Sequence, residues 1–290
     1  MSTSNYADSA LTAPATVAAA GVRRRPLLLG LVAIELLVLF APTVRFLLER
    51  WTVSVWHNAH GMFVPPLAAW LAWQELKTRT AAPVASSAWG FVFLVPALLL
   101  HALDAGMHTE LLSAVALLMA LPGLSLLLLG AERTRAIAFP LFFMVFALPI
   151  PLGITETLHL VLRHLTVAAA TTLIPYLGIS VFTEGTTLHL ANGSLQVADA
   201  CSGFSTLYAS MAVATLAAYM AGSTARRVLV LATAAPIAIA TNVLRVVLLV
   251  VLVHGWGPDA LHTILHPLSG MMTFALSLPL IFWIGGPASR

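Results

Sequence analysis

The single cysteine of the chain, Cys201, lies between a segment with strand-like alternation and an apolar stretch of helical length. The positive end of a helix dipole stabilises the thiolate form of a thiol near the helix N-terminus, so the pKa of the thiol is lowered and the nucleophilic thiolate is favoured. Asp199 or Ser202 can cap such a helix, and Gly203 lets a substrate backbone approach closely. These residues predict a reactive thiol, although a lone cysteine also serves as an ordinary small apolar side chain.

Arg245 is the charged residue of an otherwise apolar stretch, 237–253, and Asn242 precedes it by three residues. Residues at this spacing share one face of a helix. An arginine inside hydrocarbon costs about 2.5–3.5 kcal/mol on insertion scales, so it marks a functional site or a paired charge. We interpret Arg245 as functional; a structural pairing, for example with Glu35, is the alternative.

Histidines form two groups that suit proton transfer near neutral pH. His262 and His266 are four residues apart on one helical face, and either can act as the acid or base. Their spacing resembles a metal pair, but the glutamate of a His-Glu-x-x-His zinc motif is missing. His57 and His60 form the second group, which is either a proton-handling cluster or a plain loop before a helix.

A thiol, a guanidinium and an imidazole together can perform acyl transfer. The thiolate attacks a peptide carbonyl, the arginine stabilises the oxyanion, and the imidazole gives a proton to the leaving amine. The sequence therefore predicts cysteine-based acyl transfer if Cys201, Arg245 and His266 meet in one pocket.

The composition indicates the environment of these groups. Hydrophobic residues make up 60% of the 290 residues and charged residues 9%, whereas soluble domains carry about 25% charged residues. Soluble enzymes and disordered chains are excluded. One cysteine excludes a disulfide framework and a thiolate zinc site built from this chain alone, and we expect no metal and no cofactor. A single lysine and a net charge of +3 argue against nucleic-acid binding.

The elements that must position these groups are membrane helices, because a bilayer core about 30 Å thick needs about 20 apolar residues per span. We predict an all-α polytopic membrane protein with about eight transmembrane helices. The expected spans lie near 26–47, 61–76, 88–103, 110–130, 136–152, 203–221, 228–252 and 266–285.

Basic residues in short loops mark the cytoplasmic side of a membrane. With eight crossings all such residues lie inside, and so do both termini; the basic residues concerned are Arg23, Arg24, Arg25, Lys77, Arg79, Arg133, Arg135, Arg226, Arg227 and Arg290. The apolar stretch 154–178 must then enter and leave on one side or lie in the interface. We expect residues 1–22 to form a disordered cytoplasmic tail and 23–290 to form a single integral membrane domain.

The extracytoplasmic side then holds segments 48–60, 104–109, 153–202 and 253–265. The longest contains alternating residues at 186–190 and 195–197 around an Asn-Gly pair, which is a strong hairpin signal. This arrangement predicts a short extracytoplasmic β-hairpin directly before the cysteine motif.

The run Val197-Ala198-Asp199-Ala200-Cys201-Ser202-Gly203, with Ser205 two residues later, resembles the cysteine motif of the exosortase/archaeosortase family. Pro236 followed by Asn242-x-x-Arg245 resembles the arginine motif of that family, and His266-x-x-x-Gly270 resembles its histidine motif. His60-Gly61, Phe139-Pro140 to Pro149-Ile150-Pro151, and Gly178-Ile179 followed by Gly185 also fit. The resemblance covers roughly residues 51–285.

The resemblance implies an eight-span membrane cysteine enzyme in the cytoplasmic (inner) membrane of a prokaryote, with its active site on the extracytoplasmic side. Substrates of this family are membrane-anchored proteins with a C-terminal sorting tail, made of a Pro-Glu-Pro-like motif, one transmembrane helix and a basic cluster. The tail is cleaved and the protein is transferred to an acceptor. By carry-over, Cys201 is the nucleophile, Arg245 the oxyanion or carboxylate partner, and His266 the acid or base. Ala59 departs from the family, where a hydroxyl residue is frequent before His-Gly.

Two other functions remain open from the residues alone. Ten histidines allow a haem-binding bundle, although few of them lie in the middle of an expected span. A transport or export subunit would show inverted repeats and broken helices at the midplane, and the sequence shows no internal repeat.

Overall fold

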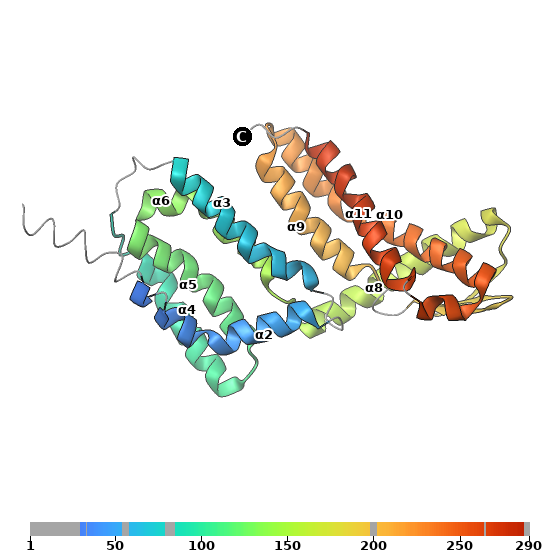
Figure 1. Ribbon diagram of the computed structural model, residues 1–290, viewed down its shortest axis with the longest axis horizontal. Coiled ribbons are helices and arrows are strands. Elements are labelled where there is room, and N and C mark those ends of the chain that lie inside the picture. Colours follow the sequence, from blue (N-terminus) through green and yellow to red (C-terminus); the bar gives the residue numbers. More distant parts are fainter. Residues whose placement is uncertain are drawn as a thin grey trace, which may run out of the picture. The chain divides into compact units, whose positions relative to one another are not determined.

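The computed structural model describes residues 30–32, 34–53, 58–78, 85–197, 202–263 and 265–286 (Figure 1). The expected tail, 1–22, lies outside the described residues. The chain divides into two compact units. The first unit comprises Met1–Phe46 and Pro83–Ala131, and the second comprises Leu47–Ala82 and Glu132–Arg290.

The first unit is built around two antiparallel helices, α4 (Gly90–Met107) and α5 (Leu111–Leu129). They approach so closely that a Cβ at Gly123 would lie 2.9 Å from the backbone nitrogen of Leu94. Phe40 is buried against this pair. The turn between the helices is fixed by Asp104, which accepts hydrogen bonds from the backbone N–H groups of Thr109 and Ser113. The carboxylate therefore satisfies an N–H group of the first turn of α5.

The second unit contains three long helices that all pack against one another (Figure 1). They are α9 (Phe204–Met220), α10 (Thr224–Trp256) and α11 (Leu265–Gly285). The described part of the unit also contains the 3-10 helix η2 (Ala59–Phe63), α3 (Val64–Thr78), α6 (Ala131–Ala136), α7 (Ala138–Phe143), η3 (Met144–Ala147), α8 (Leu152–Leu173), η4 (Ile174–Leu177) and η6 (Pro258–His262). The helix α2 (Ala41–Thr52) runs across the boundary of the two units.

A three-stranded antiparallel sheet follows η4, in the order β1 (Val181–Glu184), β2 (Thr187–Leu190) and β3 (Gly193–Gln196). The expected hairpin is confirmed, since β2 pairs with β3 and Leu190 lies opposite Gly193. The additional strand β1 was not expected. It pairs with β2 through a second two-residue loop, in which Gly185 has a φ of +60°.

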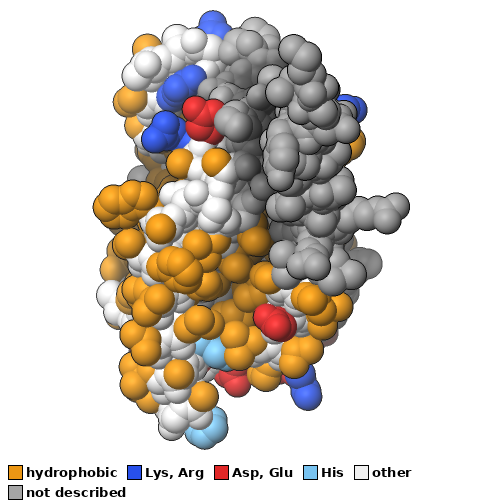
Figure 2. All heavy atoms as spheres, turned by 90° about the vertical axis from the view of Figure 1, so that its left-hand side faces the viewer, with side chains coloured by type: hydrophobic (Ala, Val, Ile, Leu, Met, Phe, Trp, Pro, Cys, Tyr) orange, Lys and Arg blue, Asp and Glu red, His pale blue; other side chains and the backbone are white. Residues whose placement is uncertain are grey.

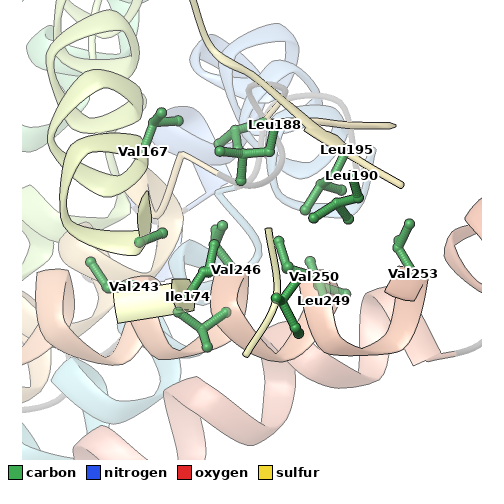
Figure 3. Packing of buried hydrophobic residues seen from close by; sticks show 14 residues of the cluster. Val167, Ile174, Leu188, Leu190, Leu195, Val243, Val246, Leu249, Val250 and Val253 are labelled. Atoms are coloured by element: carbon green, nitrogen blue, oxygen red, sulfur yellow. The ribbon is translucent and has the colours of Figure 1, made fainter. Parts of the chain in front are cut away.

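The sheet covers the C-terminal part of α10, as Figure 3 shows. Leu188 and Leu195 project from β2 and β3 onto Val246 and Val250 of α10, and Ile174 completes this core. At 1.5 Å per residue, the 33 residues of α10 extend about 50 Å, which exceeds a hydrocarbon core of about 30 Å. The tip of the hairpin is attached to the end of the helix, because Asn192 Nδ2 donates to the carbonyl of His254 at 2.7 Å.

Among the described residues, five helices are long and apolar enough to span a membrane, or six if the bent pair Gly30–Leu39 and Ala41–Thr52 is one span. The five are Gly90–Met107, Leu111–Leu129, Gly153–Leu177, Thr224–Trp256 and Leu268–Gly285, and two shorter apolar helices are Ala138–Ala147 and Phe204–Met220. The count of eight remains a prediction. The stretch 154–178 falls in α8 and η4, and the segment Gly153–Leu177 is long and apolar enough to cross a membrane, so crossing joins the two arrangements expected for this stretch.

Hydrophobic side chains cover broad areas of the face shown in Figure 2. Large apolar side chains are exposed on most of the long helices, including Leu99, Val228, Met271 and Trp283. Contiguous apolar surface of this kind needs a non-aqueous environment. The helices satisfy their own backbone hydrogen bonds, as a lipid environment demands.

Candidate functional site

Arg245 lies on α10 with only 6% of its surface exposed. Its Nε donates to Ser269 Oγ of α11 at 3.1 Å. Gly270 leaves room for the guanidinium, because a Cβ there would lie 3.1 Å from Arg245 Cζ. The small residues at the start of α11 thus allow a buried cation between two apolar helices, and the hydroxyl of Ser269 supplies one of its polar contacts.

Asn242, one turn before Arg245, connects α10 to two other elements. Its Nδ2 donates to Thr166 Oγ1 of α8 at 3.1 Å, and it is 2% exposed. Its side chain also packs directly against Gly203, the residue before α9, where a Cβ would lie 2.5 Å from Asn242 Cγ. Gly203 has a φ of +83°, so its lack of a side chain is needed for both its conformation and its packing.

A cavity of about 780 Å³ opens beside Arg245. The described residues of its walls come from η2, α3, α7, α9, α10 and α11, and these residues are apolar apart from four side chains. These four are His60, Ser205, Thr206 and Arg245. The volume lies within the range of small-ligand sites, about 300–1,000 Å³.

His60 holds a fixed orientation at the edge of this cavity. Its ring meets Tyr208 edge-on, with 4.7 Å between ring centroids. Burial lowers the pKa of His60 to about 4, and the hydrogen bond to the backbone of Phe146 opposes this effect. A carbonyl only accepts, so the imidazole donates to it, and His60 Nε2 has no hydrogen-bond partner among the described residues. The side chain is therefore a neutral imidazole with Nε2 as an acceptor.

Ser202 is buried at the start of α9, with 1% of its surface exposed. Its Oγ lies 2.6 Å from His159 Nδ1 of α8 and accepts from the backbone N–H of Phe204 at 3.3 Å. The involvement of His159 was not predicted from the sequence. The available signal was an imidazole in the first half of the largely apolar stretch 154–178, and its partner Ser202 lies 43 residues away.

The family match covers most of the chain. Residues 51–283 match the family model described as transmembrane exosortase. The chain belongs to the transmembrane exosortase family. Neither a curated protein nor a solved structure matches it significantly. The resemblance seen in the cysteine, arginine and histidine motifs is thus confirmed at the level of the family, and the chain is an integral membrane protein.

The exosortase match includes every residue that lines the cavity, from Ala59 to Phe274. Of the predicted site residues, the structure brings His60, Ser205 and Arg245 into this cavity, with Asn242 and Gly203 packed against each other.

The other predicted groups cannot be placed in the same way. Cys201 and Asp199 lie outside the described residues. The backbone of His262 ends η6 and that of His266 lies in the first turn of α11, but their side chains are outside the description. The convergence of sulfur, guanidinium and imidazole therefore stays a prediction. Among the side chains that are described, no group of three His, Cys, Asp or Glu could hold a metal ion.

Proposed function

We propose that this exosortase is a membrane-embedded cysteine transpeptidase that removes a C-terminal sorting tail from exported proteins. The substrate tail consists of a Pro-Glu-Pro-like motif, one transmembrane helix and a basic cluster, as the family resemblance implies. The reaction takes place at the extracytoplasmic side, toward which Cys201, Arg245 and His266 are all predicted to lie.

In the proposed reaction, the Cys201 thiolate attacks the carbonyl carbon of the scissile peptide bond. The C–N bond breaks, the tail leaves as an amine with a proton from His266, and the exported protein remains as a thioester on Cys201. An acceptor amine then attacks the thioester, the C–S bond breaks, the amine proton goes to the imidazole, and the Cys201 thiolate is free again. Water in place of the amine would end the cycle as hydrolysis.

The observation that carries the proposal is a buried arginine that lines a largely apolar cavity. A guanidinium in such a place is a preorganised partner for a carboxylate or for a developing oxyanion. The glutamate of a Pro-Glu-Pro motif and the tetrahedral intermediate are both anions of this kind. The guanidinium of Arg245 therefore complements the negative charge of the substrate glutamate and of the tetrahedral intermediate.

The apolar walls suit the membrane-spanning part of the same tail. Residues Ser205, Ala209, Ala212 and Leu216 of α9 recur on one helical face of the cavity wall and extend about 16 Å. Small residues on such a face let an apolar segment approach closely within a membrane. We propose that the motif lies at the Arg245 end and that the first residues of the tail helix follow the α9 wall.

The test uses a co-expressed reporter that ends in a Pro-Glu-Pro motif, an apolar helix and an arginine cluster. Loss of the tail is followed by mobility on gels, and a thioester-linked fragment on Cys201 by mass spectrometry. We expect Cys201→Ala and His266→Ala to abolish processing. Normal processing by a folded Cys201→Ala enzyme would contradict the mechanism.

Arg245→Lys separates a planar hydrogen-bonding fork from a simple positive charge. We expect a loss of processing of at least about tenfold, because lysine offers only a point charge and cannot form the bidentate arrangement. Arg135→Lys is the matched control, because Arg135 is exposed on α6, and it should keep the wild-type rate. Equal rates for the two variants would show that Arg245 acts only as a counter-charge.

A further inference from the structure

His159 and Thr166 are two side chains of α8 that contact polar side chains of segments distant in the sequence. They lie seven residues apart, which places them two turns apart on one face of the helix. His159 Nδ1 lies 2.6 Å from Ser202 Oγ, and Thr166 Oγ1 accepts from Asn242 Nδ2 at 3.1 Å. α8 therefore makes one contact with the segment that precedes α9 and another with α10.

Both contacts hold a residue that is a direct neighbour of Gly203. This glycine follows Ser202 in the chain, and it packs against Asn242 so tightly that no Cβ fits. Ser202 is thus held by the imidazole of His159 and by the N–H of Phe204, and the next residue is held by Asn242. The backbone at 202 and 203 has little freedom, because both its polar groups and its packing are fixed.

We propose that His159 is a positioning residue of the transpeptidase reaction, which acts by fixing Ser202 and hence the peptide unit that joins it to Cys201. This inference rests on the proposed function of Cys201. Adjacent Cα atoms across a trans peptide are 3.8 Å apart, so a displacement of Ser202 is transmitted to its neighbour. A nucleophile displaced by about 1 Å can lose about 100-fold in rate.

The ring of His159 also packs on Phe204, with 4.7 Å between centroids. A variant that only removed this packing would lower stability without a specific effect on the reaction. If His159 acts by positioning Ser202 through the hydrogen bond, an active variant must keep a polar atom at the place of Nδ1. Asparagine can supply such an atom, and leucine cannot.

The test compares His159→Leu, His159→Asn, Ser202→Ala and the double variant His159→Leu/Ser202→Ala, with the same tail reporter in proteoliposomes. We expect His159→Leu and Ser202→Ala each to lower kcat by about 10- to 100-fold with KM changed little, because the cavity walls are untouched. The double variant should be no slower than the slower single variant, because both remove one hydrogen bond. His159→Asn should recover most of the rate.

The matched control is His101→Leu in the first unit, where His101 Nδ1 makes the same kind of contact with Ser113 Oγ at 2.9 Å. It should keep the wild-type kcat, and thermal melting shows whether each variant is folded. The proposal is wrong if folded His159→Leu matches His101→Leu, or if the two single effects multiply in the double variant. Processing by Cys201→Ala would instead overturn the proposed function, so the two failures are distinguishable.

Discussion

Among the described residues, Arg245 and His60 are the two ionisable side chains that line the cavity. The guanidinium of Arg245 has a hydroxyl partner in Ser269. The imidazole of His60 is neutral, since burial lowers its pKa to about 4. The cavity thus offers a substrate one cationic donor and one neutral acceptor.

At this scale we predict a pH effect on stability. The pKa of His60 is about 4 in the folded protein and about 6.5 in an unfolded chain, so the unfolded chain binds more protons between these values. Stability is therefore lost as the pH falls from 6.5 to 4, and this contribution is constant above and below that window. His60→Gln should show a smaller drop in Tm over this range, measured by intrinsic fluorescence in detergent. His164→Gln, an exposed histidine of α8, should keep the wild-type drop, and an unchanged drop in His60→Gln would contradict the assignment.

The element that organises the site is α10, which contacts α8, α9, α11 and the sheet. Near its middle, Asn242 binds α8 and fits against the start of α9, while Arg245 binds α11. Further along, Val246 and Val250 lie under the sheet. One continuous helix therefore fixes the relative positions of three segments that are far apart in the sequence.

The start of α9 supplies the prediction at this scale. Gly203→Ala introduces a Cβ at 2.5 Å from Asn242 Cγ, in a residue with a φ of +83°. Gly178→Ala is the control for backbone strain alone, because its φ is +75° and no atom lies within 4 Å of the new Cβ. We expect Gly178→Ala to cost about 1–2 kcal/mol and Gly203→Ala to cost more, with a lower Tm and a loss of processing. A Tm for Gly203→Ala equal to that of Gly178→Ala would show that Asn242 adapts without cost.

The number of membrane crossings is a property of the whole molecule. Positive charges in the loops predict about eight crossings, with both termini in the cytoplasm. The continuous helix α8 is itself long and apolar enough to cross, although it contains Glu156, His159, Arg163 and His164 in its first half. If α8 crossed in addition to the predicted spans, the two termini would lie on opposite sides.

Fusions at the C-terminus test this arrangement directly. With eight crossings, a fluorescent protein fused after Arg290 is bright and alkaline phosphatase at the same position is inactive, because both tags remain in the cytoplasm. A membrane-impermeant maleimide should label intact spheroplasts at Cys201, the single cysteine, and Cys201→Ser should remove the signal. Active phosphatase at the C-terminus would indicate an odd number of crossings.

The sequence by itself determined the class of protein, the family and the hairpin. The composition indicates a lipid environment, because it sets the polarity of the whole protein surface. The family is recognisable because each of the motifs around Cys201, Arg245 and His266 is contiguous in the chain. The hairpin is equally local, because alternation and turn residues act over about ten positions.

Only the tertiary structure decided that His60, Ser205 and Arg245 share a cavity. The contact between His159 and Ser202 joins residues 43 apart, and that between Thr166 and Asn242 joins residues 76 apart. The same is true of the fit of Gly203 against Asn242. Such pairings depend on how helices pack, and the periodicity of an apolar helix does not specify which neighbour its few polar side chains will meet.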